Sequence, residues 1–390
     1  MTNLGPKVAV IYSMKQKFWS FAFLSLAVAT SGCSNGFKAV LGSAQNASST
    51  QSVGATGPAG GSGSTSANGS TNGSGSTTTG VGLSAKYPGD VGIQYDPSVI
   101  NYTNFENGYN GWTNYDPGTI GRYINIVDNP TMANGGSHYL QTTVTMSQLN
   151  SNLGPYISAY VQYQLPTPVP VLYERMYVQI VGNTLHPHHW IRVTAGNPTY
   201  NSDGLADTVP GGNNGFWYNF DLTSNNTFFY YVYWYLMRSG RCNNGTAVPG
   251  CAGDQGVTYY YGNGFNPANQ TPMPRNKWFC LELETKVNDV GQSNGLLKYW
   301  VNNQLVGDFE QGTPLGTWLR DQFFTFGQYD TNPQPFSGFN FRSASDVLIK
   351  RVLLGSYYQA NDAYMANASQ DQTILYDDVV LATQRIGCKD

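Results

Sequence analysis

Side chains that could move protons or bind an acidic group recur at two-residue spacing in the segment 188–194. Alternate residues of an extended strand face opposite sides, which places His188, Trp190 and Arg192 on one face and His189 on the other. Imidazole titrates near neutral pH, so His188 beside Arg192 has the chemistry of a general base or acid. This face is therefore the first candidate for a catalytic surface.

Three further segments show the same alternation, with one apolar face and one face rich in aromatic and charged side chains. The residues expected on the second face are Arg175, Tyr177, Gln179, Tyr231, Tyr233, Tyr235, Glu282, Glu284 and Lys286. If the strands belong to one sheet, this face suits a sugar polymer, because aromatic rings stack on pyranose faces and fixed polar groups bind hydroxyls or carboxylates. Each residue taken alone also fits an ordinary cross-strand pair on a solvated sheet face.

Two other chemistries fit these segments less well. In the run 186–189 only the first and third residues could share a face, and Pro187 interrupts the strand, so a metal site is not favoured. Glu282 and Glu284 have the same-face spacing of a glycosidase carboxylate pair. Their run Glu-Leu-Glu-Thr-Lys lacks the Glu-x-Asp-x-x-Glu pattern of laminarinase-like jelly rolls, which weakens a hydrolase hypothesis.

The elements that must position these residues are strands. Helical periodicity is nearly absent, whereas short alternating runs rich in Val, Ile, Tyr, Phe and Trp and bounded by Gly, Asn and Pro are frequent. Strands are expected near 138–146, 156–164, 172–181, 188–194, 216–222, 228–237, 278–288, 295–301, 322–329, 347–354 and 374–383. The pattern predicts an all-β fold, a two-sheet antiparallel β-sandwich of jelly-roll type, with long loops at 195–216 and 238–275.

The composition limits the partners. Charged residues make up 11% of the chain, and the formal net charge is −3. Ordinary soluble domains carry about 25% charged residues, so polarity here comes mainly from Asn, Ser, Thr, Gln, Gly and Tyr. Because there is no basic field, neither a nucleic acid nor an anionic lipid surface is expected to bind by charge.

The N-terminal part has the features of an export signal. Lys15 and Lys17 precede an apolar run over 18–28, and small residues lead from there to Cys33. The small residues and the cysteine resemble the lipobox of bacterial lipoproteins, in which the cysteine is lipidated. The alternative is a soluble secreted protein with an ordinary cleavage site near Gly32.

The sequence thus divides into three parts. Residues 1–33 are expected to be a lipoprotein signal peptide, 34–84 a Gly/Ser/Thr-rich flexible linker, and 85–390 one β jelly-roll domain. The expected location is outside the cytoplasm, on the bacterial cell envelope at the outer membrane or the cell surface. Membrane contact is expected through the lipid anchor only, and the protein is expected to be a monomer.

Four cysteines remain after Cys33, and an even number in an exported chain indicates two disulfides among three possible pairings. The Asn-Asn-Gly and Pro-Gly sequences between Cys242 and Cys251 favour a tight local bond there. That choice leaves Cys280 to pair with Cys388. A metal site is the alternative, but no Cys-x-x-Cys motif or Cys/His cluster supports it.

Acidic residues near the two ends of the predicted domain suggest a calcium site. Phe105-Glu106 lies near its start, and Asp377 and Asp378 lie near its end. These runs resemble carbohydrate-binding jelly rolls of the xylanase-associated type, in which a similar Phe-Glu and an Asp of the last strand hold a structural Ca²⁺. Carboxylate oxygens are suitable Ca²⁺ ligands. The sequence leaves open which of Asp377 and Asp378 binds, since the two point to opposite faces.

A second resemblance covers much of the domain. Its residues are Trp278-Phe279-Cys280-Leu281-Glu282, the run 295–302, and Tyr376-Asp377-Asp378-Val379-Val380 with Ile386-Gly387-Cys388. These runs resemble the fungal cellulose-induced jelly-roll proteins and their bacterial relatives, which are akin to glucuronan and alginate lyases. The resemblance implies a concave face that binds polysaccharide, a structural calcium and, in some members, β-elimination.

Such a lyase needs a group that neutralises a uronate carboxylate, a base for the C5 proton and an acid for the leaving oxygen. Arg192 or Arg175 could neutralise the carboxylate, His188 could be the base, and Tyr233 could be the acid. A non-catalytic carbohydrate-binding module, or a surface adhesin with a protein partner, explains the same face without chemistry. The sequence therefore leaves open whether the protein is an enzyme, and favours a lyase over a hydrolase if it is.

Overall fold

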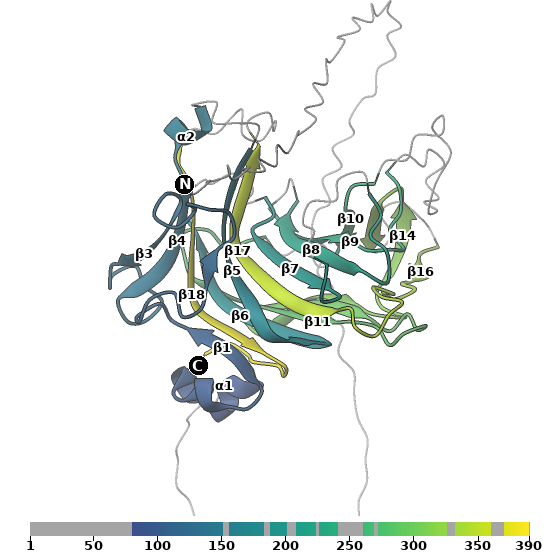
Figure 1. Ribbon diagram of the computed structural model, residues 1–390, viewed down its shortest axis with the longest axis horizontal. Coiled ribbons are helices and arrows are strands. Elements are labelled where there is room, and N and C mark those ends of the chain that lie inside the picture. Colours follow the sequence, from purple (N-terminus) through teal and green to yellow (C-terminus); the bar gives the residue numbers. More distant parts are fainter. Residues whose placement is uncertain are drawn as a thin grey trace, which may run out of the picture. The chain divides into compact units, whose positions relative to one another are not determined.

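The computed structural model describes residues 80–150, 156–182, 188–200, 208–223, 226–240, 260–268, 272–325, 332–359 and 370–389. These residues form a sandwich of two β-sheets whose strands pair mostly in antiparallel fashion (Figure 1). The exception among the described strands is the parallel pair β10 (Asn263–Asn266) and β15 (Gln322–Thr325). The predicted all-β, two-sheet sandwich is therefore confirmed.

Sheet A contains eight of the described strands. In spatial order its main path is β13 (Gln304–Phe309), β12 (Leu296–Val301), β11 (Phe279–Lys286), β6 (Val171–Ile180), β18 (Gln372–Ala382), β4 (His138–Val144) and β3 (Ile124–Asp128). The remaining strand, β1 (Val99–Thr103), pairs with β18. The first and the last strand of the described domain, β1 and β18, are thus neighbours in this sheet.

Sheet B contains ten of the described strands. Their order is β16 (Gln334–Pro335), β14 (Leu315–Leu319), β15, β10, β9 (Phe228–Tyr233), β8 (Gly215–Leu222), β7 (Ile191–Gly196), β17 (Leu348–Gln359), β5 (Tyr156–Val169) and β2 (Thr113–Asn114). Non-consecutive neighbours such as β7 and β17 show that strands distant in the sequence meet in the middle of this sheet.

Helices are few and short in the part of the chain that the structure describes. They are α1 (Leu83–Lys86), α2 (Met146–Asn150) and two 3₁₀ turns, Pro88–Asp90 and Ile93–Tyr95. None of them is long and apolar enough to cross a membrane.

The core lies between the sheets because each strand turns alternate apolar side chains inward. On β6 the buried row includes Leu172, Met176 and Val178, and on β8 it includes Phe216 and Phe220. The alternation follows from the two-residue period of a strand. It leaves the opposite row of each strand on an outer face, where the candidate chemical groups lie.

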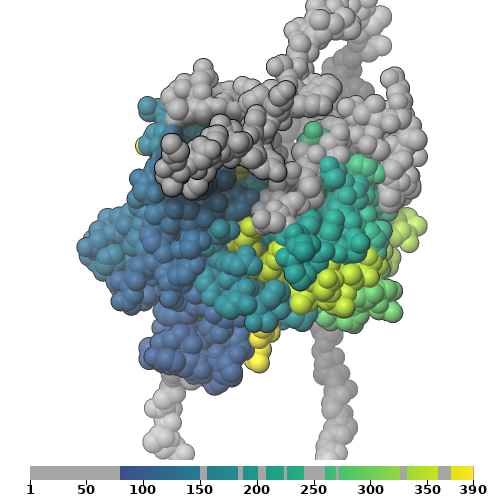
Figure 2. All heavy atoms as spheres, in the orientation of Figure 1, coloured from purple at the N-terminus to yellow at the C-terminus, as the bar shows by residue number. Residues whose placement is uncertain are grey.

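Both ends of the described domain lie on the outer face of sheet A. The backbone N–H groups of Leu83 and Ser84 donate hydrogen bonds to the carbonyls of Arg385 and Ile386. The two segments approach so closely that a Cβ at Gly82, which has a φ of 65°, would lie 2.4 Å from the Arg385 carbonyl oxygen. Only glycine fits that conformation and that space. Figures 1 and 2 show α1 beside the C-terminal residues.

A disulfide fixes the C-terminal segment to the same sheet. Cys280 on β11 is bonded to Cys388, which confirms this predicted pair. The backbone N–H of Cys388 also donates to the Asn303 side chain. The other predicted pair, Cys242 with Cys251, lies outside the described residues.

One carboxyl group is buried in the core itself. Glu174 on β6 is fully buried, and the Tyr218 hydroxyl donates to its Oε1 atom at 3.2 Å. The Tyr218 hydroxyl is also 2.7 Å from that of Thr285. Burial raises the pKa of Glu174 to about 8, because the charged form is poorly solvated there. Glu174 is therefore protonated and neutral at neutral pH.

We expect Glu174→Gln to remove one pH-dependent loss of stability. The folded protein keeps the Glu174 proton up to about pH 8, whereas the unfolded chain releases it near 4.5. Stability from this group is thus present at low pH and lost as the pH rises through the folded pKa. The difference between the melting temperatures of the variant and the wild type, measured by circular dichroism, should change in favour of the variant as the pH is raised. A difference that stays constant with pH would show that Glu174 does not titrate in this way.

Candidate functional site

The strongest concentration of polar and aromatic groups lies on the outer face of the middle of sheet B. We call the outer faces of β7, β8, β9 and β17 the site face. Cross-strand pairing places Arg192 opposite Asn219, and Asn219 opposite Tyr231. The next row places Trp217 opposite Tyr233. Directly paired residues share a face of the sheet, so the register itself assembles these side chains.

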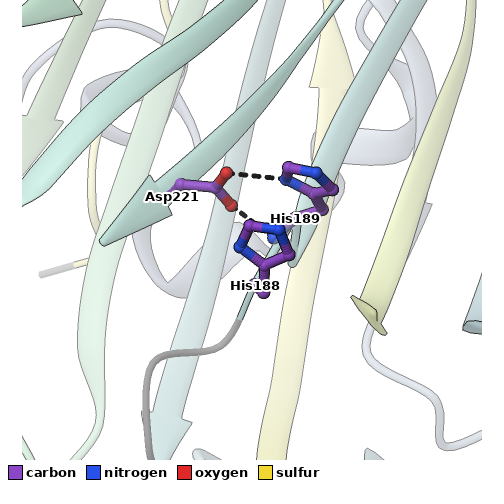
Figure 3. A group of neighbouring side chains, drawn as sticks. All are labelled: His188, His189 and Asp221. Carbon is purple, nitrogen blue, oxygen red and sulfur yellow. Dashed lines mark hydrogen bonds and ion pairs between the residues drawn. The ribbon is translucent and has the colours of Figure 1, made fainter. Parts of the chain in front are cut away.

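A histidine–aspartate pair stands at one end of the site face. The Nδ1 atom of His189 lies 2.7 Å from Oδ2 of Asp221, and the backbone N–H of His189 donates to Oδ1 of the same carboxylate. The His188 ring stacks on the His189 ring with centroids 3.7 Å apart. Figure 3 shows the Asp221 carboxylate, from β8, directed at the two histidines, which precede β7.

The local backbone explains why His189 faces this way. His189 has a φ of 53°, in the left-handed region that few non-glycine residues adopt. This turn interrupts the strand alternation just before β7. It brings the His189 ring to the site face and sends Trp190 into the core, where its ring packs near Phe220 and Phe228.

Arg192 is held by aromatic rings and an amide. Its guanidinium lies 5.2 Å from the ring centroid of Tyr160 and 5.1 Å from that of Trp217. Its Nε donates to Oδ1 of Asn219 at 2.9 Å. The Nδ2 atom of Asn219 is buried and has no hydrogen-bond partner among the described residues. An unpaired buried amide donor is costly, so it is the kind of group that a ligand's acceptor would satisfy.

Two tyrosine hydroxyls complete the site face. The hydroxyls of Tyr231 and Tyr233 are 3.5 Å apart, and the Tyr231 ring stacks 5.1 Å from the His189 ring. Tyr233 stacks on Trp217 with centroids 4.2 Å apart. The phenol of Tyr231 therefore stands directly beside the histidine–aspartate pair, with the phenol of Tyr233 next to it.

Burial sets the charges of the histidine–aspartate pair. Desolvation, helped by the positive charge of Arg192, holds the pKa of His189 well below its ordinary value. Burial raises the pKa of Asp221 to about 6, against the lowering effects of the His188 charge and the backbone N–H groups. Above pH 6 the pair thus consists of a neutral imidazole and a carboxylate. Burial likewise raises the pKa of Tyr231 well above 10, so its hydroxyl keeps its proton.

The three residues in Figure 3 could also hold a metal ion. His188, His189 and Asp221 offer ligand atoms that all lie within 4.8 Å of one another. Two imidazoles and a carboxylate form a ligand set that Zn²⁺ accepts with one position left open. The sequence run 186–189 did not indicate such a set, because its third member comes from another strand.

The structure corrects the expectation that all predicted site residues share one face. Arg175 and Glu282 belong to β6 and β11 of sheet A, not to sheet B. Arg175 is fully buried and forms an ion pair with Asp90 at 2.6 Å. Glu282 is also fully buried and accepts hydrogen bonds from the backbone N–H groups of Ile386 and Gly387. The two ends of the described domain cover both groups, which gives them structural partners.

The other predicted residues of these two strands are also on sheet A. They are Tyr177, Gln179, Glu284 and Lys286. The Tyr177 hydroxyl accepts a hydrogen bond from the backbone N–H of Lys389, so it too contacts the C-terminal segment. Their separation from sheet B has a simple cause. Alternation gives the face of each strand, but it does not give the sheet to which the strand belongs.

Two sheet B residues also differ from expectation. Trp190 is fully buried in the core and does not face outward, because the turn at His189 shifts the alternation. Tyr235 lies in the turn after β9 ends at Tyr233, so of the three predicted outward tyrosines only Tyr231 and Tyr233 belong to the strand. Arg192, Tyr231 and Tyr233 lie on the outer face as predicted.

The three acidic residues predicted to bind calcium lie around one loop. Asn134 hydrogen-bonds to Asp377 through its backbone and to Asp378 through its side chain. Both oxygens of Glu106 accept hydrogen bonds from Ser137, at the end of the same loop, and from His138, the first residue of β4. Oxygen ligands of this kind suit Ca²⁺. As a set of three, however, the described carboxylates do not gather within 4.8 Å, as the histidine site does.

Sequence reasoning missed three residues of the site face: His189, Asp221 and Asn219. A usable signal was present in Phe216-Trp217-Tyr218-Asn219-Phe220-Asp221, where polar residues alternate with core aromatics. Only the register shows that Asn219 meets Arg192, and only the turn at His189 brings its ring to Asp221.

Comparison with known proteins gives distant likenesses in structure alone. The sequence matches no family model and no curated protein. An endo-β-1,4-glucuronan lyase from Trichoderma reesei is 12% identical. The match covers 73% of this chain and 95% of the lyase, with a TM-score of 0.41. An alginate lyase from Aplysia kurodai is 12% identical, with coverages of 67% and 87% and a TM-score of 0.43. An alginate lyase from Chlorella virus is 11% identical, the match covers 73% of this chain and 99% of that protein, and the TM-score is 0.42. Likenesses at this level carry no residue-by-residue correspondence.

Asp221 should determine which nitrogen of His189 carries the proton. An ionised carboxylate only accepts hydrogen bonds, so at pH 7–8 the proton is expected on Nδ1, leaving the Nε2 lone pair free of it. ¹⁵N NMR of the histidine rings should show this tautomer in the wild type and its loss in Asp221→Asn. His138, whose Nδ1 faces Glu106, should keep its spectrum in both proteins. A His189 tautomer that is unchanged in Asp221→Asn would contradict the pairing.

Proposed function

We propose that the site face binds an acidic polysaccharide and cleaves it by β-elimination next to a uronate. The observation that carries this proposal is the meeting of three functions within contact range. A neutral histidine is oriented by a carboxylate (His189 and Asp221), a cation is paired with an amide (Arg192 and Asn219), and a phenol donor lies beside them (Tyr231). We therefore assign the role of the base to His189, which is bonded to Asp221, and no longer to His188.

Each group has one task in this mechanism. Arg192, with the unpaired Nδ2 donor of Asn219, neutralises the uronate carboxylate and so acidifies the C5 proton. The Nε2 atom of His189 takes that proton while Asp221 stabilises the imidazolium that forms. The C4–O bond then breaks and a C4=C5 double bond forms. Tyr231 or Tyr233 gives its proton to the leaving oxygen.

The lyase proposal predicts product with a specific chromophore. Purified protein incubated with glucuronan, alginate or pectate should produce unsaturated ends that absorb in the ultraviolet. His189→Asn should reduce kcat by about 100-fold or more, since general base catalysis contributes about 10²- to 10⁴-fold. Asparagine is chosen because it tolerates the positive φ at this position.

His188→Ala is the matched control, because it removes the neighbouring stacked ring and leaves the His189–Asp221 pair in place. We expect it to affect KM more than kcat. If His188→Ala abolishes activity and His189→Asn does not, the base is His188. Polymer binding without any unsaturated product from all three polymers would replace the lyase with a non-catalytic binding module.

The pH dependence follows from Asp221. Its raised pKa of about 6 means that it is protonated below that pH, and a neutral carboxyl group cannot stabilise an imidazolium. We expect kcat/KM to fall as the pH drops below about 6 in the wild type, and Asp221→Asn to be slow at every pH. A rate that stays level down to pH 5 would contradict this assignment.

We also propose that Ca²⁺ binds to Glu106, Asp377 and Asp378, the three carboxylates that contact the loop containing Asn134 and Ser137. Burial and the neighbouring Asp378 raise the pKa of Asp377 to about 8, which reflects two carboxylates crowded together. Calcium should raise the melting temperature of chelator-treated protein by about 5 °C, whereas Mg²⁺ should not. The increase should vanish in Asp377→Asn and persist in Asp371→Asn, an exposed acidic residue near the start of the same strand. An equal calcium response in both variants would overturn the site.

Export and lipid anchoring at Cys33 belong to the proposal as well. They rest on the sequence pattern of residues 1–33, which lie outside the described residues. A polymer too large for import is a sensible substrate for a protein held outside the cytoplasm.

A further inference from the structure

A pocket separate from the site face lies toward the β16 end of sheet B. Its volume is about 340 Å³, within the size range of small-ligand sites. The residues lining it include Arg238, Trp318, Phe323, Gln334, Pro335 and Ser337. Gln334, Pro335 and Ser337 are exposed, so the pocket opens to solvent.

The side chain of Arg238 has no ionic partner among the residues that the structure describes. Its backbone N–H and C=O are both bonded to the side chain of Asn263, and its guanidinium lies 4.4 Å from the ring centroid of Trp318. The structure gives this guanidinium no hydrogen bond and no ion pair with any described residue. Desolvation lowers the pKa of Arg238 to about 10, which leaves it charged at neutral pH. A partly buried cation without a counter-ion is costly.

Sheet geometry separates this pocket from the histidine site. Trp318 pairs directly with Phe323, and Phe323 pairs with Phe265. Phe265 and Phe323 both belong to the core, so Trp318 lies on the core-facing side of sheet B. The His189–Asp221 pair lies on the opposite, outer side. A ligand in the pocket would therefore not touch the proposed catalytic groups.

We propose that this pocket binds one sugar residue that carries an oxyanion. The planar guanidinium of Arg238 presents two parallel donors to a carboxylate or sulfate. Trp318, Phe323 and Pro335 form an apolar floor against which a sugar ring can pack. The side chains of Gln334 and Ser337 at the rim can bind ring hydroxyls. This inference does not rest on the lyase proposal, because none of its residues takes part in that chemistry.

A ¹⁹F NMR titration tests the pocket directly. The full chain is labelled with 5-fluorotryptophan, and the Trp318 resonance is assigned from Trp318→Phe. Sodium glucuronate and glucose 6-sulfate are the acidic probes, and methyl glucoside is the neutral one. We expect the acidic probes to shift the Trp318 resonance in a saturable way. We expect Arg238→Gln to weaken that binding by about tenfold or more, the loss typical of a charged hydrogen bond.

The control is Arg320→Asn, which removes an exposed arginine from the β14–β15 turn. It should leave the titration unchanged, and so should Asp221→Asn on the site face. The relative responses to glucuronate and glucose 6-sulfate show which oxyanion the pocket prefers. An unmoved Trp318 resonance, an equal response to methyl glucoside, or unchanged affinity in Arg238→Gln would each overturn the inference. A protein inactive on every polymer could still pass this test.

Discussion

Each central strand of sheet B contributes side chains both to the core and to the site face. The pleat sends alternate side chains to opposite sides, so on β8 Phe216 and Phe220 fill the core while Asn219 and Asp221 stand on the site face. A slip of one residue in register would exchange the two rows. The buried aromatics thus hold the polar groups in place, and the chemistry of the site depends on the packing of the core. This dependence accounts for the dense aromatic contacts behind the site, such as those among Trp190, Phe220 and Phe228.

Charged residues have opposite roles in the two sheets. On sheet A, Arg175 is neutralised by Asp90, and Glu282 is satisfied by backbone N–H groups, so these charges hold the two ends of the described domain against the sheet. On sheet B, Arg192 is bonded to the neutral amide of Asn219 and lies against the rings of Tyr160 and Trp217, and we propose that it binds the carboxylate of a ligand. The residue types are the same on both sheets. The partners differ between the two sheets, and under the proposed function Arg192 serves recognition whereas Arg175 serves stability.

Much of the fold could be predicted from the sequence, because long amphipathic strands have a strong two-residue signal. β5, β6 and β11 lie close to where they were expected, whereas β1, β3, β10, β13 and β14 were missed. These strands are four to six residues long, and their polar and glycine residues interrupt the alternation of apolar side chains. Their pairing depends on neighbours more than on their own propensity. The Cys280–Cys388 bond was predictable because few pairings were possible.

The site was only partly predictable for a different reason. Alternation gave the outward direction of Arg192, Tyr231 and Tyr233, but it failed at Trp190, where the left-handed turn at His189 shifts the pattern. Nothing local places Arg175 and Arg192 in different sheets. Strand order results from the packing of the whole domain, and a single sequence does not reveal it.

Both ends of the described domain cover the outer face of sheet A, and this has a practical consequence. Leu83 and Ser84 are hydrogen-bonded to Arg385 and Ile386, and Cys388 is covalently tied to β11. Both ends of the described domain therefore lie on the side of the sandwich opposite the site face. A reporter protein or an immobilising tag joined at either of these ends would leave the histidine face of sheet B open to long polymers. The same arrangement makes the domain suitable for display in arrays, since its points of attachment and the histidine face lie on opposite sides.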